Sequence, residues 1–408
     1  MRVLHTSDWH LGRVFHGAPL LGDQRRALTR VVDIARAAAV DVVVVAGDVY
    51  DRAIPPADAV DLLGDVLGEL RATGAVVVAI TGNHDSPNRV GALDPLLRAG
   101  GVTLRGRFDP AAPVVVPATD GGPDLVVHPV PYQEPLAAGA EQGAAPPGRR
   151  TTQHDVMAWA LDAVRADLAA RGPVRSVVVA HAFVAGAAPS DSERELSVGG
   201  VDRVPLDVFD GITYTALGHL HRPQAPAEGL AYSGSLLPYS FSETQPSSVR
   251  LVDLAPDGTV AGEVVPLGVE RPVVTLEGRL EALLADPAHR AAEGAWVRAR
   301  LTDEVLPRHA MDRLRDRFPH AVVLEHRAPA AGAGPADIRH RADEVTDLDL
   351  ALAFLGQQLG RPAADDEAAL LAAAFAAVAA GRQERPLVPV AAAGGGPGDG
   401  VGAAGAVA

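Results

Sequence analysis

The sequence contains neither cysteine nor lysine, and each absence narrows the chemistry open to the chain. Without cysteine, disulfides and thiolate metal sites are excluded, so a bound metal would depend on oxygen and nitrogen ligands. All 36 basic residues are arginine, which together with heavy use of alanine, glycine, proline and valine indicates a coding bias. The abundance of alanine and arginine therefore carries no functional argument.

A long hydrophobic run is also missing. The longest, AALLAAAFAAVAA at residues 368–380, is shorter than the roughly 20 residues that span a bilayer. The amino-terminal MRVLHTSDWH has no apolar segment after a basic start, so it predicts no secretion signal and we expect a cytoplasmic protein. The net charge of −15 argues against a generally basic surface that coats nucleic acid, but it does not exclude a local basic groove or bound cations.

The length of 408 residues predicts two or three domains. Up to about residue 270, short β-branched runs alternate with helical periodicity, which predicts a layered α/β sandwich. Most of the runs are continuously apolar, as in strands buried on both faces. Strands are predicted at residues 3–6, 42–46, 75–80, 125–128, 174–180 and 212–217. Core-facing helical stripes are predicted on Val60, Leu63, Leu67 and Leu70, and on Met157, Leu161, Val164 and Leu168.

Composition also predicts the domain boundaries. An Asp257-Gly258 turn between two strand-like runs predicts a hairpin over residues 249–266 that closes the first domain. Beyond it, a Pro/Gly/Ala-rich stretch predicts a linker, and the Ala/Gly-rich end of the chain predicts disorder. The predicted divisions are 1–270 for the first domain, 271–328 for a small α/β module, 329–345 for the linker, 346–385 for two helices and 386–408 for the disordered tail.

Five polar clusters follow predicted strands of the first domain, in the segments SDWHLG, AGDVYD, TGNHD, VAHAF and LGHLHR. Because loops at the carboxyl ends of strands in an α/β sheet converge on one crevice, the clusters could meet in space. They supply carboxylate oxygen, imidazole nitrogen and one amide oxygen, a mixture that suits manganese, iron or zinc better than calcium. The candidate residues are Asp8, His10, Asp48, Asp51, Asn83, His84, Asp85, His181, His219 and His221.

The spacing of these residues favours a site for two metals. Asp8 and His10 are separated by one residue, as are His219 and His221, so in an extended loop both members of a pair leave the same face. A carboxylate such as Asp48 can bridge two cations, and two neighbouring cations can share a hydroxide and hold a phosphate for attack. A glycine precedes the ligand in three of the clusters and lets the backbone turn tightly.

Each cluster taken alone also has a structural interpretation. A lone Asp-x-His or a single histidine after a strand is weak evidence, and aspartate often begins a turn where a strand ends. Burying several imidazoles and carboxylates together, however, costs free energy unless they are paired or bind metal. We therefore favour one common metal site. The histidines outside the pattern are interpreted as structural or surface residues: His5, His16, His128 and His154.

Taken in order, DWH, GDVYD, GNHD, H and GHLH resemble the motifs of the calcineurin-like metallophosphoesterases. The longer segments HTSDWHLG, VAGDVYD, YTALGHLHR and YSGSLLPYSFSE are similar to those of bacterial exonuclease subunits within that superfamily. The resemblance covers about residues 1–330. It implies a two-sheet sandwich flanked by helices, with a small α/β capping domain that contacts DNA and C-terminal helices.

Carried over to this chain, the family pattern implies a role for each motif residue. One metal would be held by Asp8, His10 and His221, and the other by Asn83, His181 and His219, with Asp48 bridging the two. The ions are expected to be Mn²⁺. His84 would contact the scissile phosphate and assist departure of the leaving oxygen, and Asp85 would orient His84 or its loop. DNA-contacting residues are not predicted, because arginines beside the motifs fit surface ion pairs equally well.

Three functions remain open at this point. The first, implied by the resemblance, is metal-dependent hydrolysis of DNA, with double-strand exonuclease and single-strand endonuclease activity, in repair, recombination and replication. A coiled-coil ATPase held by the C-terminal helices would control it, and the chain would form a homodimer within a heterotetramer. The second is a stand-alone phosphoesterase for small nucleotides or phosphoproteins, which would not need the capping module. The third is a non-catalytic scaffold, disfavoured because no ligand position is replaced.

Overall fold

The computed structural model describes residues 1–142, 151–193, 203–329, 346–359 and 361–383. The chain divides into two units, Met1–Ala328 and Pro329–Ala408. The predicted disordered tail and nearly all of the predicted linker lie outside the described residues. Within the described part of the chain, no helix combines the length and hydrophobicity needed to cross a membrane.

Two six-stranded sheets form the centre of the first unit. In order across the first sheet, the strands are β14 (Val260–Pro266), β13 (Ser248–Leu254), β1 (Arg2–Thr6), β4 (Val42–Ala46), β5 (Val76–Ile80) and β6 (Val102–Arg105). In order across the second, they are β11 (Gln224–Ala227), β12 (Leu230–Tyr232), β10 (Tyr214–Gly218), β9 (Arg175–His181), β8 (Leu125–Val130) and β7 (Val114–Val116). The run from β1 to β6 is parallel, as is the run from β12 to β8.

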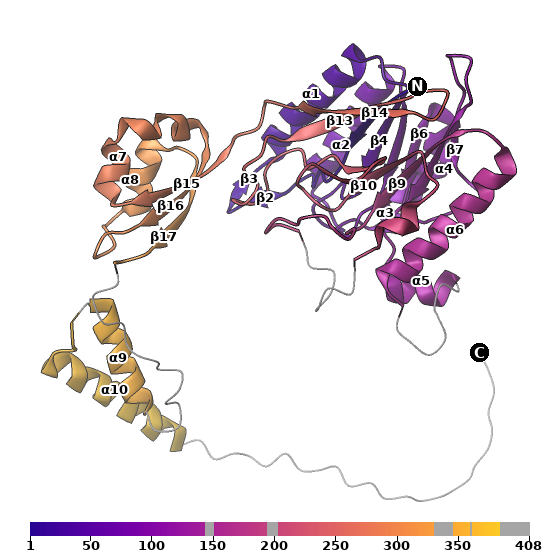
Figure 1. Cartoon of the computed structure of the whole chain (residues 1–408). Coiled ribbons are helices and arrows are strands. Elements are labelled where there is room, and N and C mark those ends of the chain that lie inside the picture. The colour runs from indigo at the N-terminus through magenta and orange to yellow at the C-terminus, as the bar shows by residue number, and fades with distance from the viewer. Residues whose placement is uncertain (143–150, 194–202, 330–345, 360, 384–408) are drawn as a thin grey trace, which may run out of the picture. The chain divides into compact units, whose positions relative to one another are not determined.

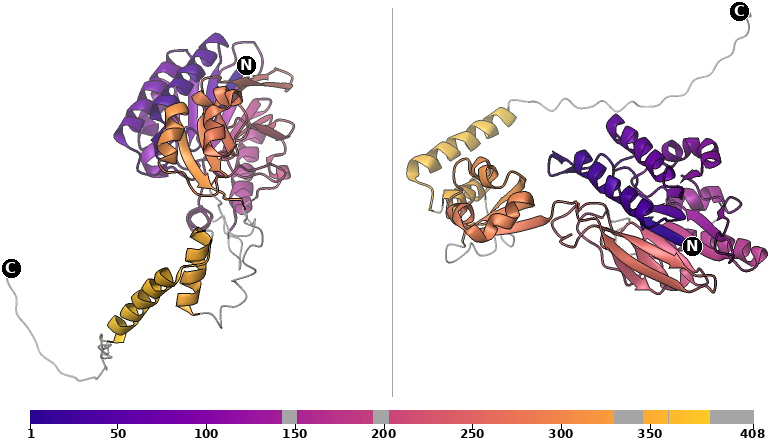
Figure 2. Two further views of the ribbon diagram at one scale, coloured as in Figure 1. Left: turned by 90° about the vertical axis from the view of Figure 1, so that its left-hand side faces the viewer. Right: turned by 90° about the horizontal axis from the view of Figure 1, so that it is seen from above.

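The sheets pack face to face, and helices cover their outer faces (Figures 1 and 2). Valines fill the space between the sheets, where Val42 and Val44 share one cluster with Val177 and Val179. Helices α1 (Leu21–Ala37) and α2 (Ala57–Arg71) cover the first sheet, and α6 (Gln153–Arg171) covers the second. Because every central strand has the other sheet on one face and a helix on the other, both faces are apolar. The predicted two-sheet α/β sandwich is confirmed.

The six predicted strands are all present, each within two residues of its predicted ends. The pattern missed β6, β7, β11 and β12, which have three or four residues each and offer little periodicity to read. It also missed a two-stranded hairpin of β2 (Val14–Phe15) and β3 (Ala18–Pro19). Short helices complete the unit, namely α3 (Pro87–Val90), α4 (Asp94–Leu97) and α5 (Pro135–Gln142).

Helix α2 buries a face that differs from the predicted stripe. Val60 is 45% exposed, so its assignment to the core was wrong. The buried stripe instead consists of Ala59, Leu62, Leu63, Val66, Leu67 and Leu70. An alanine next to a valine carries too little hydrophobic signal to fix the phase at the start of a helix. On α6, Met157, Leu161 and Val164 are buried as predicted and Leu168 is partly buried.

The hairpin predicted around the Asp257-Gly258 turn is present as the antiparallel pair β13 and β14. After it comes a three-stranded parallel sheet in the order β15 (Val273–Gly278), β16 (Trp296–Leu301) and β17 (Ala321–His326). Two helices pack on this sheet, α7 (Leu280–Ala285), which was not predicted, and α8 (Ala310–Arg317). The residues expected to form a small α/β module do so.

The second unit contains two helices close to their predicted ranges. They are α9 (Asp347–Leu359) and α10 (Asp365–Gln383), and they contact each other. Both expose large apolar side chains, including Phe354, which is 62% exposed, and Leu370, which is 74% exposed. Two short helices with exposed apolar faces do not form a core of their own.

Candidate metal centre

The seven predicted metal ligands lie at the carboxyl ends of parallel strands from both sheets. The first sheet supplies Asp8, His10, Asp48 and Asn83, after β1, β4 and β5, and the second supplies His181, His219 and His221, from the end of β9 and after β10. All are buried except Asn83, which is partly exposed. The loops converge at this edge because the strands that precede them are parallel and adjacent.

Four of these residues lie on strained backbone. Asp8, His10, Asp48 and His219 have φ angles of 52°, 45°, 49° and 100°. Residues other than glycine rarely adopt this region, and each instance costs about 1–3 kcal/mol. Backbone hydrogen bonds tie the loops together, since the Asp8 N–H donates to the Gly47 carbonyl at 3.1 Å and the His10 N–H to the Asp48 carbonyl at 2.9 Å. The surrounding fold therefore sets the directions of the ligands.

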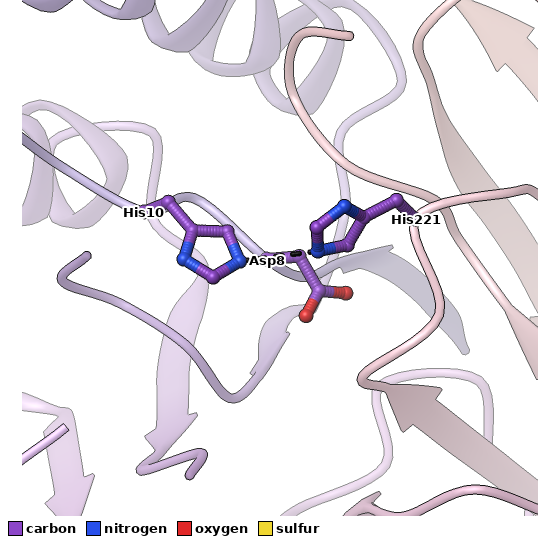
Figure 3. Close-up of side chains that lie close together, drawn as sticks. All are labelled: Asp8, His10 and His221. Carbon is purple, nitrogen blue, oxygen red and sulfur yellow. Dashed lines mark hydrogen bonds between the residues drawn. The ribbon is translucent and has the colours of Figure 1, made fainter. Parts of the chain in front are cut away.

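Asp8, His10 and His221 form one donor group, with one ligand atom of each within 4.8 Å of the others. Figure 3 shows the two imidazole rings facing each other beside Asp8, and His10 Nε2 lies 3.1 Å from His221 Nε2. Two nitrogens bound at right angles to one ion through bonds of about 2.1 Å would be about 3 Å apart, so this separation fits a shared cation. The Asp8 carboxylate is held by the Ser7 hydroxyl, which donates at 2.6 Å.

Asn83, His181 and His219 form a second donor group. Asn83 Oδ1 lies 3.0 Å from His181 Nε2 and 3.2 Å from His219 Nδ1. The other nitrogen of His181, Nδ1, donates to the Ala46 carbonyl at 2.9 Å. In the neutral ring, His181 Nε2 therefore directs a lone pair at the oxygen of Asn83. Two facing acceptors need a proton or a metal ion between them.

Asp48 lies between the two donor groups. Its Oδ2 is 3.6 Å from His10 Nε2 and 3.5 Å from His181 Nε2. Its Oδ1 accepts a hydrogen bond from the His84 N–H at 2.9 Å. One carboxylate oxygen thus faces both groups, which is the placement that a bridging ligand requires.

Burial and neighbouring charges set the ionisation of these donors. Burial alone would lower the pKa of His181 and His221, but Asp48 raises the pKa of His181 to about 9 and Glu243 raises that of His221 to about 8. Burial lowers the pKa of His219 to about 3. Burial disfavours the charged form of Asp48 as well, yet the charge on His181 holds the pKa of Asp48 well below its usual value. A divalent cation would take over the positive charge that protons otherwise supply.

The residues present fit a transition-metal dication. Imidazole nitrogens combined with carboxylate and amide oxygens suit manganese, iron or zinc. Two buried atoms of the cluster, His10 Nδ1 and Asn83 Nδ2, have no hydrogen-bond partner in the structure. A site held together by hydrogen bonds alone would not be expected to leave such atoms unpaired. The site therefore has the composition of a ligand set rather than of a closed polar network.

His84 lies beside the first donor group. Its Nδ1 contacts the Asp51 carbonyl oxygen at 2.8 Å, which places a proton on Nδ1. Its ring meets that of His10 edge to face, with centroids 4.7 Å apart. His84 also forms a third group of potential ligand atoms with His10 and Asp48, within 4.8 Å. The geometry thus brings His84 to the site but leaves its role open between ligand and acid.

Asp85 points away from the donors and into the protein. It accepts hydrogen bonds from the N–H groups of Val49 at 3.0 Å, Tyr50 at 2.8 Å and Gly82 at 2.9 Å. Burial, together with the charge of Asp48, raises the pKa of Asp85 to about 7. Its carboxyl group joins the loop after β4 to the loop after β5.

Glycine is required at two points of these loops. Gly47 has a φ of 90°, and a Cβ there would overlap the His181 ring. A Cβ at Gly82 would overlap the Asp48 carboxylate. Only a residue without a side chain lets the backbone come this close to the ligands.

Two buried residues that the sequence analysis did not single out hold the ligand loops. The Gln24 side chain on α1 donates to the carbonyls of Trp9 at 3.0 Å and His10 at 2.7 Å. Glu243 Oε1 lies 3.3 Å from His221 Nδ1. Glu243 ends the segment YSGSLLPYSFSE, so an acidic residue inside a recognised motif was a usable signal. Gln24 lies in an ordinary amphipathic helix, which offers none.

The four histidines outside the polar clusters belong to none of the donor groups among the described residues. His5 is buried between the sheets, with Nδ1 2.9 Å from the Tyr214 hydroxyl. His128 Nε2 lies 2.9 Å from Asp167 Oδ2. His16 and His154 are exposed.

Comparison with family models gives two matches. Residues 1–223 match the calcineurin-like phosphoesterase family. Residues 269–358 match a family described as the type 5 capsule protein repressor C-terminal domain. The first match contains all seven donors, and the second begins where the module of β15 to β17 begins.

Three curated proteins, each named as the D subunit of the nuclease SbcCD, are similar to the chain. The Bacillus subtilis protein is 34% identical over 291 residues, which cover 67% of this chain and 71% of that protein. The Escherichia coli K12 protein is 33% identical, covering 70% and 73%, and the Staphylococcus saprophyticus protein is 28% identical, covering 86% and 90%. Among solved structures, TT1561 of Thermus thermophilus is 13% identical with a TM-score of 0.38, covering 64% of this chain and 98% of that one.

Proposed function

Because the chain belongs to the calcineurin-like phosphoesterase family and, within it, is related to the D subunits of SbcCD nucleases, we propose that it is a metal-dependent DNA nuclease. It hydrolyses phosphodiester bonds at DNA ends and hairpins, as a double-strand exonuclease and a single-strand endonuclease. The observation that carries this proposal is the convergence of two donor groups on the single carboxylate of Asp48.

The protein's own residues have distinct tasks in this reaction. We propose that Asp8, His10 and His221 hold one divalent ion, that Asn83, His181 and His219 hold a second, and that Asp48 bridges them. Divalent ions supply activation of a water molecule and neutralisation of charge on the phosphate. Asp8 and Asp48 are the two carboxylates of the set and so offset part of the cationic charge.

His84 is the proposed proton donor to the leaving oxygen. Its Nδ1–H is committed to the Asp51 carbonyl, so the ring is held in place with Nε2 as the remaining nitrogen. A proton on Nε2 can then pass to the oxygen that leaves as the phosphodiester bond breaks. Asp85 supports this arrangement by holding together the loops that carry Asp48 and His84.

The rest of the chain supports a large substrate under the control of a partner. The relatives are named as one subunit of a two-part nuclease, and a second family model covers residues 269–358. We propose that the module of β15 to β17 caps DNA and that α9 and α10 bind a coiled-coil SbcC-type ATPase. The ions are Mn²⁺, the chain dimerises within a heterotetramer, and the complex acts in the cytoplasm in DNA repair, recombination and replication.

A stand-alone phosphoesterase for small nucleotides or phosphoproteins is the alternative. It would use the same donors, but it would have no need of the additional module or the apolar helices. The test is incubation with Mn²⁺ and linear duplex DNA, with and without the ATPase partner and ATP. We expect Mn²⁺-dependent degradation that the partner and ATP stimulate. Turnover of a cyclic nucleotide with no cleavage of DNA in any combination would contradict the nuclease.

A further inference from the structure

Glu243 lies next to the proposed ligand His221. Its side chain is 6% exposed, and Oε1 lies 3.3 Å from His221 Nδ1. The Ser192 hydroxyl lies 2.6 Å from the same nitrogen. The opposite nitrogen, Nε2, faces His10 Nε2 at 3.1 Å. His221 therefore has one nitrogen turned to the protein and one to the first donor group.

The Glu243 carboxylate is itself fixed from several directions. The Ser190 hydroxyl donates to Oε1 at 2.7 Å, and the Ser192 hydroxyl donates to the same oxygen. The Tyr239 N–H donates to Oε2 at 2.8 Å. Donors at both oxygens suit a carboxylate, which accepts at each, and do not suit an amide, which accepts at only one.

We propose that Glu243 is a positioning residue for the metal held by Asp8, His10 and His221. It keeps the His221 proton on Nδ1, so that the Nε2 lone pair faces the ion. Carboxylates that contact the outer nitrogen of a metal-bound histidine fix its tautomer and orientation, and their loss typically costs 10–100-fold in metal affinity. This inference rests on the metal centre of the proposed function and adds a residue to it.

The same contacts attach a further segment to the centre. Glu193 Oε1 accepts the His221 N–H at 2.9 Å, and the Asp191 N–H donates to the Ser242 hydroxyl at 3.0 Å. With Ser190 and Ser192 on Glu243, residues 190–193 are bound to the loop of His221 and to the turn that carries Glu243. Occupation of the first metal site and the position of this segment are therefore linked.

The variant Glu243→Gln tests the proposal, because it keeps the size of the side chain and removes one acceptor. Mn²⁺ binding is measured without DNA, by calorimetry and by electron paramagnetic resonance of the bound ions. We expect two ions in the wild-type protein. In E243Q one ion should bind as in the wild type, and the other should bind about 10–100-fold more weakly.

Two control variants separate the carboxylate from its surroundings. Ser192→Ala removes the hydroxyl but keeps Glu243, and should weaken metal binding less than E243Q does. Glu228→Gln changes an exposed carboxylate and should have no effect. A second measurement needs no variant at position 243: nitrogen-15 spectra of the zinc-loaded wild-type protein should show His221 protonated at Nδ1 and bound to zinc through Nε2.

Wild-type affinity for both ions in E243Q would overturn the proposal, as would an equal loss in S192A. Zinc on Nδ1 of His221 would overturn it even if E243Q failed to fold. In each of these cases the proposed nuclease would stand, because its wild-type metal site would be intact. Failure of the wild-type protein to bind any metal would instead overturn both.

Discussion

The side chains of Asn83, His84 and Asp85 leave one loop in three directions. Asn83 faces His181 and His219, His84 contacts the Asp51 carbonyl, and Asp85 accepts backbone N–H groups. Successive residues of an extended segment alternate in direction, so polar neighbours in sequence can have separate tasks. At the scale of single residues, substitutions should therefore separate the chemistry from the binding of metal.

For His84→Ala we expect both ions and the affinity for DNA to be kept, with cleavage slowed by roughly 10²–10⁴-fold, the usual contribution of a general acid or base. The physical reason is that the proposed ligand set is complete without His84. The measurements are metal content, DNA affinity and the single-turnover cleavage rate. Loss of a metal ion from H84A would show that His84 is a ligand, which the group that it forms with His10 and Asp48 would then explain.

Asp48→Ala provides the matched comparison. Because Oδ2 of Asp48 faces a histidine from each donor group, we expect its loss to empty both metal sites. Elemental analysis after reconstitution with Mn²⁺ measures this directly. Two ions retained in D48A would show that Asp48 does not bridge.

Metal binding should release protons at neutral pH. The pKa of His181 is raised to about 9 and that of His221 to about 8, so both rings are protonated at pH 7 before an ion binds. An ion needs the neutral rings, so affinity should fall as pH falls, by up to about tenfold per pH unit for each displaced proton. Calorimetry at pH 7 in buffers with different ionisation enthalpies counts the protons. An enthalpy that is the same in all buffers would contradict this assignment.

At the scale of elements, His5 links the two sheets. It lies on β1, and its nitrogens contact the Tyr214 hydroxyl at 2.9 Å and the Leu217 carbonyl at 3.1 Å, both on β10. Burial lowers the pKa of His5 to about 3. The neutral ring is therefore part of the packing between the sheets, in the layer that also positions the metal centre.

This link predicts a pH-dependent stability. In the unfolded chain His5 has an ordinary pKa near 6.5 and binds a proton below that pH, whereas the folded protein resists protonation down to about pH 3. The unfolded state then binds more protons, so the free energy of unfolding should decrease as pH falls from 6.5. For His5 this amounts to about 2 kcal/mol at pH 5.

The measurement is denaturant unfolding at pH 7 and pH 5 for the wild type and His5→Gln. The variant should lose less stability between these pH values, by the amount attributed to His5. His154→Gln, at an exposed position, serves as the control and should behave as the wild type. An equal pH dependence in all three proteins would contradict the role assigned to His5.

At the scale of the whole molecule, catalysis and partner binding should be separable. Helices α9 and α10 expose Phe354 and Leu370 and belong to a different unit from the metal centre. Deleting residues from about 340 onward should abolish binding of the ATPase while Mn²⁺-dependent cleavage remains. A pull-down with the partner, together with a nuclease assay of the truncated chain, checks both parts.

Point variants make this test sharper. Phe354→Asp combined with Leu370→Asp places charge on the exposed apolar surface and should weaken partner binding strongly. Asp366→Asn alters an exposed polar position of α10 and should not. A complex that survives the truncation would place the partner site elsewhere in the chain.

Much of the site could be read from the sequence because its residues come in short motifs after apolar strands. The segments SDWHLG, GDVYD, GNHD and GHLH give residue type, order and position relative to the strands. Parallel α/β topology then brings the loops to one edge. Gln24 and Glu243 could not be assigned in this way, because their roles depend on contacts with His10 and His221 that are distant in sequence.

The sequence by itself determined the α/β class, the buried valine strands, the helical segments and the identity of the candidate donors, since each depends on local pattern. Only the tertiary structure decided how the donors are grouped, which face of α2 is buried and what Asp85 contacts. The reason is physical: the left-handed backbone at Asp8, His10 and Asp48 is unfavourable locally and is imposed by packing and long-range hydrogen bonds. The direction of a ligand is thus a property of the whole first unit.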